Sequence, residues 1–352
     1  MKIINVDLSS KSYNIVIQNG LIDDLGAKIS GIYTNKKIAV ITDENVAHFY
    51  ESRVKESLEK NDYDVEFIIV KPGESSKSME ELKRVYEQLL DFHLTRSDLV
   101  IALGGGVVGD LAGFAASTYL RGVDYVQIPT TLLAQIDSSI GGKVAVNLEQ
   151  GKNLIGSFYQ PKKVFIDPEL LRSLPDKYIK DGLGEVIKYA CIKDADFFQK
   201  LSKINTKEQF YNHLEEIIFT CCNIKREIVE KDEHDKGDRM LLNFGHTLGH
   251  AIEKYFKYKY SHGEAVSLGM YDITKKSETL GITEQGTAEK IKNMLINFKI
   301  NYDLPDLNWK EIKDIILLDK KNSSGNLNLI LLEKIGSSFI KTIPIKKLNT
   351  FF

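Results

Sequence analysis

The alternation of hydrophobic and polar positions gives strand signals to the first half of the chain. Tyr13, Ile15 and Ile17 recur at every second position, which is typical of a strand with one buried face. Leu99–Leu103 is an all-apolar run ended by glycines, as expected for a central strand of a parallel sheet. Similar patterns predict further strands at residues 37–42, 66–70, 125–128 and 164–166, and helices at 79–92 and 110–120. The alternation predicts an α/β layer with a mostly parallel sheet.

Beyond about residue 168 the pattern changes to helical periodicity. Helices are predicted at residues 208–233, 241–257, 264–280 and 284–297, and strands only at 328–332 and 339–345. We therefore expect an α/β-plus-α protein. A Rossmann-like nucleotide-binding domain should occupy residues 1–168 and a mainly helical domain residues 169–352. A cleft between two such domains is a natural ligand site.

Composition narrows the function classes. The 47 basic and 49 acidic residues give a formal charge of -2, so no nucleic-acid or anionic-membrane partner is indicated. The chain has three cysteines, Cys191, Cys221 and Cys222, and no C-x-x-C pair. Their odd number argues against a disulfide framework and favours a reducing compartment. The N-terminal segment MKIINVDLSS has no long apolar region, so we expect no signal peptide and a cytoplasmic location.

A glycine motif indicates a dinucleotide site. Gly104-Gly105-Gly106-Val107-Val108-Gly109 matches G-x-G-x-x-G between a predicted strand and a predicted helix. In that context the backbone can approach a pyrophosphate at the helix N-terminus. A tight turn without a ligand stays an alternative. The polar segment Pro72–Lys77 follows another predicted strand, where open α/β sheets bind ligands; by itself, a solvated loop with a helix cap explains it better.

Histidines and one acidic residue indicate a metal site. His246, His250 and His262 lie within 17 positions, and the first two would share one helix face. Glu185 and Lys188 are neighbours on another predicted helix. Two imidazoles and a carboxylate form a common catalytic zinc set. Core or capping histidines and a surface Glu–Lys pair remain alternatives, and the spacing leaves open which histidines bind metal and which exchange protons.

Cations next to glycines suggest an anionic substrate. Gly141-Gly142-Lys143 and Gly151-Lys152-Asn153 place lysines beside expected glycine loops, and Arg121, Lys225 and Arg239 lie near the other motifs. Lysine and arginine suit phosphate and carboxylate recognition, although each one singly fits a solvated surface charge. These patterns predict a two-domain enzyme that uses a dinucleotide and a metal, without specifying the reaction.

The motifs taken together resemble the 3-dehydroquinate synthase family over nearly the whole chain. The resemblance rests on these ordered segments: ALGGGVVGD (102–110), YLRG (119–122), QIPTTLLAQIDSS (127–139), GKNLIGSFYQP (151–161), EVIKY (185–189), LNFGHTLGHA (242–251) and HGEAV (262–266). It implies conversion of 3-deoxy-D-arabino-heptulosonate 7-phosphate to 3-dehydroquinate and phosphate. The implied steps are transient oxidation by NAD, phosphate elimination, re-reduction and intramolecular aldol closure.

The resemblance also implies roles for particular residues. Implied metal ligands, for Zn²⁺ or Co²⁺, are Glu185, His246 and His262. Implied NAD contacts are Asp43, Asn45, Glu74, Lys77, Gly104, Gly105, Gly106, Asp110, Thr130, Thr131, Lys152 and the segment Leu170, Leu171, Arg172 and Ser173. Implied substrate contacts are Arg121, Asp137, Lys143, Asn153, Lys188, Lys225, Arg239, Asn243, His250 and Lys320, with Lys321 as the alternative to Lys320. The implied catalytic residues are His250, Lys188, Asp137 and Asp235.

Two aspects of the resemblance bear on how far these roles carry over. Asp235 stands where the family usually has a glutamate assigned to proton transfer with His250, and a shorter carboxylate would act through water. Arg121 in this family reaches the active site of the neighbouring subunit, which implies a homodimer.

The rival functions are another sugar-phosphate cyclase, of the 2-deoxy-scyllo-inosose or valiolone type, a metal-dependent glycerol or alcohol dehydrogenase, and a non-catalytic nucleotide-binding protein.

Overall fold

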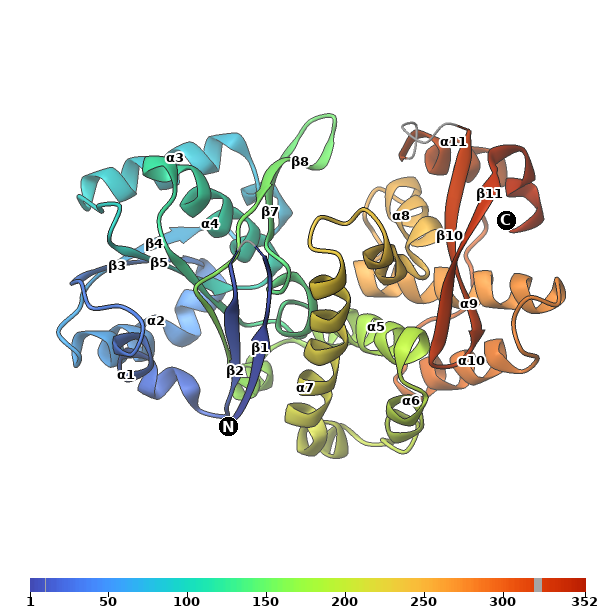
Figure 1. Ribbon diagram of the computed structural model, residues 1–352, viewed down its shortest axis with the longest axis horizontal. Coiled ribbons are helices and arrows are strands. Elements are labelled where there is room, and N and C mark those ends of the chain that lie inside the picture. Colours follow the sequence, from blue (N-terminus) through green and yellow to red (C-terminus); the bar gives the residue numbers. More distant parts are fainter. Residues whose placement is uncertain (10, 320–324) are drawn as a thin grey trace. The chain divides into compact units, whose positions relative to one another are not determined.

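The computed structural model describes residues 1–9, 11–319 and 325–352, and chain contacts divide them into two compact units, Met1–Pro175 and Asp176–Phe352 (Figure 1). The sequence prediction placed its boundary after residue 168. The residues between the predicted boundary and the observed one at Pro175 include most of the 3-10 helix η5 (Pro168–Ser173), which belongs to the first unit. The Tyr50 hydroxyl is bonded to the Leu170 carbonyl and the Ser173 hydroxyl, and these contacts hold η5 there.

A seven-stranded sheet is the centre of the first unit. Its strands are β1 (Lys2–Val6), β2 (Tyr13–Ile17), β3 (Lys37–Asp43), β4 (Asp64–Val70), β5 (Leu99–Gly104), β6 (Tyr125–Pro129) and β9 (Lys163–Ile166). The strand order is β1-β2-β9-β6-β5-β3-β4. Only β1 and β2 pair antiparallel; the other pairs are parallel. The chain leaves β3 toward β4 but leaves β5 toward β6, so the strand order reverses between β3 and β5.

Helices cover both faces of this sheet (Figure 1). They are α1 (Leu25–Ser30), α2 (Glu44–Glu59), α3 (Met79–Asp91) and α4 (Gly106–Thr118), with the short turns η1 (Leu21–Asp24), η2 (Glu74–Ser76), η3 (Tyr119–Arg121) and the π-helical η4 (Ala134–Ser138). Apolar side chains of α3 and α4 pack on one face, and those of α1 and α2 on the other. Each face therefore has its own apolar core, which explains why the central strands are apolar throughout.

The residues next to the expected glycine loops lie on a β-hairpin. Lys143 begins β7 (Lys143–Leu148), and Lys152 and Asn153 lie on β8 (Gly151–Phe158), which pairs antiparallel with β7. The register shifts between Val146 and Leu148. The turn beside Lys143 is present, with φ values of 98° at Gly141 and 67° at Gly142, whereas Gly151 already belongs to β8. The two strands were not predicted, because contacts between them fix their pairing and the glycines nearby do not reveal it.

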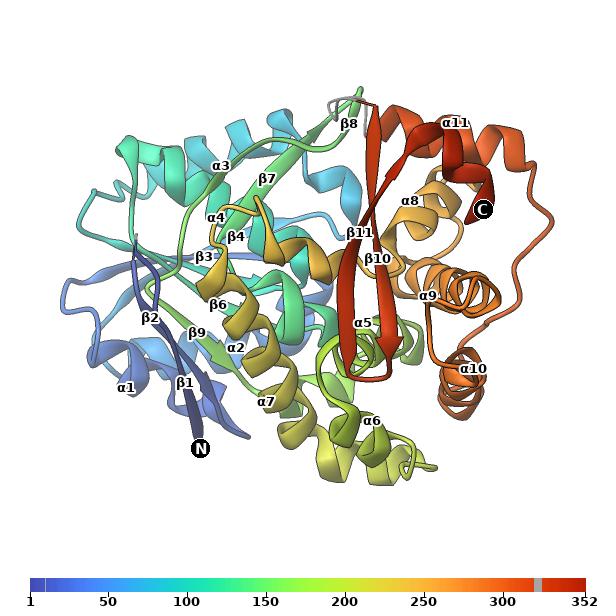
Figure 2. The same ribbon diagram turned by 45° about the vertical axis from the view of Figure 1, so that its right-hand side comes forward.

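The second unit is mainly helical and carries one antiparallel ribbon. Its elements are α5 (Asp176–Lys193), α6 (Ala195–Leu201), α7 (Lys207–Lys231), η6 (Asp238–Asn243), α8 (His246–Tyr255), α9 (His262–Thr279), α10 (Thr287–Asn297), α11 (Trp309–Asp319), β10 (Asn326–Lys334), β11 (Ser337–Pro344) and η7 (Ile345–Thr350). Figure 2 shows β10 and β11 as a long ribbon. Helix α9 packs against α5, α8 and α10, so it forms the centre of the unit.

The predicted elements agree with the structure except near residue 245. The sequence predicts one helix over 241–257, whereas the 3-10 helix η6 ends at Asn243 and α8 begins at His246. Gly245 separates them with a left-handed φ of 79°. A Cβ on Gly245 would lie 2.5 Å from the side chain of Met270, so close packing on α9 interrupts the helix there. No described helix is long and apolar enough to span a membrane.

Candidate functional site

Helix α5 buries a charged pair in the interior of the second unit. Glu185 is fully buried and Lys188 is 1% exposed. Their side chains form an ion pair one helical turn apart. The surface-pair alternative is therefore wrong for these residues. Burying two charges costs several kcal/mol per ion unless they are well compensated, so this pair requires a further explanation.

The imidazoles on α8 and α9 face the Glu185 carboxylate. Nε2 of His246 lies 3.5 Å from Oε1 of Glu185, and Nε2 of His262 lies 3.4 Å from the same oxygen. One potential ligand atom from each of the three residues lies within 4.8 Å of the others. His250 lies beside this cluster, with ring centroids 5.3 Å from His246 and 6.0 Å from His262. The structure thus groups the predicted ligands and leaves His250 next to them.

The two histidines are held by the ends of their helices. His246 is the first residue of α8, directly after Gly245, and its Nδ1 lies 3.1 Å from the Phe244 carbonyl. His262 is the first residue of α9. There, the Glu264 carboxylate accepts a hydrogen bond from the Ser261 amide, and the Asp181 carboxylate accepts one from the Gly263 amide. These caps satisfy backbone groups of α9 and fix the position from which His262 projects.

Electrostatics within the cluster favour a mixture of protonation states. Burial by itself would raise the pKa of Glu185, but Lys188 and both imidazoles hold it well below its usual range. Burial lowers the pKa of His246, against the opposing effect of Glu185. Burial also opposes the charged form of His262, but the Glu185 and Glu253 carboxylates next to its ring raise its pKa to about 10. These effects favour an ionised Glu185 and a neutral His246, and they favour the protonated form of His262.

The donor set of the cluster fits a divalent metal. Both Glu185 oxygens are buried, and neither completes a hydrogen bond of regular geometry with a described residue. Oε1 lies 3.5 and 3.4 Å from Nε2 of the two histidines, and Oε2 pairs with Lys188. Two imidazoles and one carboxylate suit zinc or cobalt and leave a coordination position open. Lys188 contacts only one oxygen of the buried carboxylate. A cation at the other oxygen would compensate the remaining charge.

A second candidate region lies in the first unit, at the carboxyl ends of β3 and β5, where the strand order reverses. In open α/β sheets this is the usual place for a ligand. Gly104 ends β5, Gly105 caps α4 and Gly106 begins it. A Cβ on Gly104 would lie 2.6 Å from Val108, and one on Gly105 would lie 3.0 Å from Thr131. The turn therefore requires small residues and leaves the backbone amides at the start of α4 accessible to an anion.

Polar side chains around these strand ends include unpartnered hydroxyl groups. The Thr42 and Thr130 hydroxyls are buried and have no hydrogen-bond partner among the described residues. Thr42 lies on β3, and Thr130 follows β6, where its amide bonds to the Gly104 carbonyl. Thr131 is half-buried beside Gly105. These hydroxyl groups could therefore form hydrogen bonds with a nucleotide bound at the glycine turn.

A buried ion pair lies in the same unit. Lys77 is 5% exposed, and its Nζ lies 2.6 Å from Oδ2 of Asp110 on α4. Glu74 accepts a hydrogen bond from Asn147 on β7. The polar segment 72–77 is thus tied to α4 and to the β7–β8 hairpin, which the solvated-loop alternative does not predict. Asn147 was not singled out from the sequence, because nothing near it in the chain signals this contact.

Other expected NAD contacts have local structural roles. The Asp43 carboxylate caps α2 by accepting from the amides of Asn45 and Val46, and burial raises its pKa. Asn45 itself is exposed. In η5 the side chains of Leu170 and Leu171 are buried, whereas Arg172 and Ser173 are exposed. Of these four side chains, only Arg172 and Ser173 reach solvent, and the Ser173 hydroxyl is bonded to Tyr50.

The remaining substrate candidates of the first unit lie on strained or exposed backbone. Asp137 is half-buried on the π-helical turn η4, a geometry frequent at functional sites. Lys143 and Asn153 are exposed on the hairpin, as is Lys152, an expected NAD contact, and Asn153 has a φ of 58°. Arg121 is exposed, and its φ of 69° follows a positive φ at Leu120. Such strain is commonly kept where a side chain must be presented.

In the second unit, buried cations lie near the end of α7 and on η6. Lys225 on α7 is 6% exposed and Arg239 is 3% exposed. The Asp232 carboxylate accepts from the amide of Arg239, and the Arg239 guanidinium donates to the Glu233 carbonyl. Asp235 lies in this turn with a φ of 56°. The predicted Lys320, like its alternative Lys321, lies outside the described residues.

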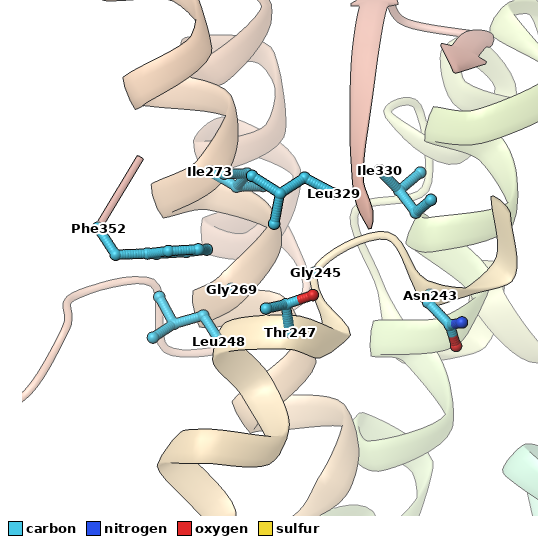
Figure 3. A pocket seen from close by; sticks show the side chains of 9 residues that line it. All are labelled: Asn243, Gly245, Thr247, Leu248, Gly269, Ile273, Leu329, Ile330 and Phe352. Carbon is cyan, nitrogen blue, oxygen red and sulfur yellow. The ribbon is translucent and has the colours of Figure 1, made fainter. Parts of the chain in front are cut away.

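A small pocket in the second unit does not coincide with the cluster. Apolar side chains of α8, α9 and β10 line it together with Phe352 (Figure 3). Asn243, which the resemblance assigns to substrate binding, lies at its edge, apart from Leu248 and Phe352 (Figure 3). Glu185, His246 and His262 are not among its lining residues. The pocket is a small gap in the packing of α8, α9 and β10, and its lining does not include the cluster.

The sequence analysis missed Glu253. This residue lies on α8, is 9% exposed, and its Oε2 lies 3.5 Å from Nδ1 of His262. Its position three residues after His250 and seven after His246 places all three on one helix face. That spacing was the available signal.

Sequence comparisons with known proteins identify one family, and structural comparisons identify the fold. Models of the 3-dehydroquinate synthase N-terminal and C-terminal domains match residues 67–181 and 182–322. A 3-dehydroquinate synthase of Clostridium botulinum is 57% identical over 347 residues, covering 98% of this chain and 99% of that protein. A 2-deoxy-scyllo-inosose synthase, solved with carbaglucose-6-phosphate, NAD⁺ and Co²⁺, has a TM-score of 0.88 at 24% identity over 99% of each chain. A 2-epi-5-epi-valiolone synthase from Streptomyces hygroscopicus, solved with NAD⁺ and Zn²⁺, has a TM-score of 0.86 at 24% identity over 97% and 96%.

Proposed function

Because this chain belongs to the 3-dehydroquinate synthase family, we propose that it converts 3-deoxy-D-arabino-heptulosonate 7-phosphate to 3-dehydroquinate and phosphate. Such an enzyme is a carbon–oxygen lyase that depends on NAD and on a divalent metal, with zinc the preferred candidate and cobalt the alternative. The single observation that carries the proposal is the buried cluster of Glu185, His246 and His262.

The metal-binding residues follow from the chemistry of that cluster. Glu185 and the Nε2 atoms of His246 and His262 would hold the metal. When bound there, it would act as a Lewis acid toward a substrate oxygen. Lys188 would keep Glu185 ionised in the interior, and His262 would have to release its proton before binding.

NAD is assigned to the first unit. The glycine turn Gly104–Gly106, the hydroxyl groups of Thr130 and Thr131, and the Lys77–Asp110 pair would hold it, together with Glu74, Lys152, Asp43, Asn45 and the exposed part of 170–173. When bound, it would supply a transient hydride acceptor. The support is the position of these groups at the reversal of strand order, the usual ligand site of such sheets.

Substrate binding and proton transfer are assigned to the remaining residues. Lys225 and Arg239 are buried cations, suited to a phosphate or carboxylate because little solvent competes with them. The other proposed contacts are Arg121, Asp137, Lys143, Asn153, Lys188, Asn243 and Lys320. His250 lies beside the metal cluster, and imidazole is the most frequent side chain for proton exchange near neutral pH. Asp235 would assist it through water.

The assembly and location of the enzyme are also proposals. The strained presentation of Arg121 fits a side chain that reaches a neighbouring subunit, so we propose a homodimer. Three free cysteines, all buried, fit a reducing compartment such as the cytoplasm. The rival cyclases are not favoured, because they are 24% identical to this chain whereas a 3-dehydroquinate synthase is 57% identical.

The test is turnover of the purified protein with the heptulosonate phosphate, NAD and zinc, following phosphate, dehydroquinate and NADH together. Equal amounts of phosphate and dehydroquinate, with no accumulation of NADH and loss of activity on chelation, are expected. NADH that accumulates from simple alcohols would instead identify a dehydrogenase. Phosphate release only from glucose 6-phosphate or sedoheptulose 7-phosphate would identify one of the other cyclases.

A further inference from the structure

Glu253 is a buried carboxylate beside the proposed metal centre, and the proposed reaction assigns it no role. Its Oε2 lies 3.5 Å from Nδ1 of His262, while Nε2 of the same ring lies 3.4 Å from Glu185. The imidazole of His262 is therefore placed between two carboxylates, one at each nitrogen. This arrangement determines which nitrogen is directed toward Glu185.

The two proposed histidine ligands differ in what lies behind them. Nδ1 of His246 lies 3.1 Å from the backbone carbonyl of Phe244, a neutral acceptor. Nδ1 of His262 faces the Glu253 carboxylate. A partner at the second ring nitrogen fixes the tautomer and orientation of a metal-bound histidine and makes the ligating nitrogen more basic. A carboxylate does this more strongly than a carbonyl, because it carries a full negative charge.

The approach of Glu253 to His262 depends on the packing of α8 against α9. Both helices carry glycines where they meet: a Cβ on Gly269 would lie 2.1 Å from the Gly245 carbonyl, and one on Gly249 would lie 3.1 Å from Ala265. This close approach brings Glu253, on α8, to the first residue of α9. The contact is therefore set by the backbone, and flexible side chains alone do not account for it.

We propose that Glu253 is a positioning residue, which orients His262 through Nδ1 and presents Nε2 to the metal. This inference rests on the metal site of the proposed function. It predicts that Glu253 governs how tightly the metal is held, although it is not a ligand.

Two substitutions separate the charge of Glu253 from its contact. Glu253→Gln keeps the size and a carbonyl oxygen but removes the charge, whereas Glu253→Ala removes both. We expect zinc affinity to fall about tenfold in Glu253→Gln and up to about 100-fold in Glu253→Ala, with faster loss of zinc to excess EDTA. Competition with a chromogenic chelator gives the affinity. Thermal unfolding of the zinc-free proteins shows whether each variant is folded, and Glu253→Gln decides if Glu253→Ala is not.

Glu264→Gln is the matched control. It removes a negative charge two residues from His262, on the same helix, and glutamine keeps the capping interaction. We expect wild-type zinc affinity in this variant. Equal losses in the Glu253 and Glu264 variants would overturn the proposal, because general charge would then explain them.

Two further outcomes would also decide against it. Wild-type zinc affinity in a folded Glu253→Gln would show that Glu253 does not position His262. A wild-type protein that binds two zinc ions, with Glu253→Gln losing only the weaker one, would make Glu253 a ligand of a second ion together with His250 and His262. A wild-type protein that binds no zinc would instead contradict the proposed metal site itself.

Discussion

The candidate binding regions of the two units consist of different kinds of chemical group: backbone groups in the first and charged side chains in the second. In the first unit the strand ends and the turn Gly104–Gly106 offer mainly backbone groups. In the second unit the cluster consists of buried charged side chains, with Glu185 fully buried and Lys188 1% exposed. The geometry of the backbone region follows from the steric limits on its glycines. The side-chain cluster holds charges that a partner must compensate, so its changes should have the larger effects.

Removing the central carboxylate should have the largest effect. Glu185→Ala removes the one carboxylate of the ligand set and leaves Lys188 buried without its partner. We expect turnover to fall by at least about 10³-fold, as loss of several kcal/mol of transition-state stabilisation implies. We also expect the free energy of unfolding to fall by about 3–5 kcal/mol. Steady-state kinetics and urea unfolding measure the two losses, and near wild-type values for either would contradict the role given to the cluster.

Separating α8 from α9 should come next. Gly269→Ala places a Cβ 2.1 Å from the Gly245 carbonyl, so the helices must move apart. Overpacking of this kind costs about 1–3 kcal/mol, and zinc affinity should fall with it. Gly31→Ala is the control, because its Cβ would meet only a carbonyl 3.6 Å away. If Gly269→Ala bound zinc like the wild type, the dependence of the cluster on this packing would be refuted.

Breaking the buried ion pair of the first unit should affect NAD and leave zinc unchanged. Lys77→Met leaves the Asp110 carboxylate, which is 20% exposed, without its partner. The loss of stability should be smaller than for Glu185→Ala, because water reaches Asp110 in part. NAD titration by fluorescence should show weaker binding, with zinc affinity as in the wild type. A parallel loss of zinc would mean that the two regions are not independent.

Zinc affinity should rise with pH. The folded pKa of His262, about 10, lies above the value near 6.5 expected for an unfolded histidine. Its stabilising effect on the zinc-free protein is therefore complete below about pH 6.5 and is lost as pH rises toward 10. Zinc requires the neutral ring, so binding at neutral pH should release about one proton. Calorimetry in buffers of different ionisation enthalpy measures this, and His262→Gln should abolish it; no proton release in the wild type would contradict a protonated His262.

An exposed ion pair of the second unit should show the smallest effect. Lys200 and Glu216 pair at 2.8 Å with side chains 66% and 47% exposed. Glu216→Ala should change the free energy of unfolding far less than Glu185→Ala, because solvent screens an exposed pair, and zinc affinity should stay as in the wild type. A loss as large as that of Glu185→Ala would show that burial is not what distinguishes the pairs.

The contrast between the regions also explains what the sequence alone could predict. Runs such as Leu99–Leu103 and the glycines after them signal their conformation locally, so the central strands and the turn into α4 were predicted. The β7–β8 hairpin was missed because its register depends on pairing across the turn. The burial of Glu185 and Lys188 was also undetermined, since their spacing fits a surface helix equally well.

Some residues of the candidate site could be predicted from local spacing, and others depend on how the helices pack. His246 and His250 share a helix face, which their spacing predicts. Whether His262 and Glu185 lie beside them depends on α5, α8 and α9 packing together, which only the family resemblance anticipated. Glu253 was missed although it continues the same face, because its partner is the first residue of another helix.

The most direct test of the account is anomalous X-ray scattering at the zinc edge, from crystals of the zinc-loaded protein and of Glu185→Ala. We predict one strong peak in the wild type, in contact with the Glu185 carboxylate and with Nε2 of His246 and His262, and no peak there in the variant. Zinc bound elsewhere, or an equal peak in Glu185→Ala, would contradict the assignment of this cluster as the metal centre.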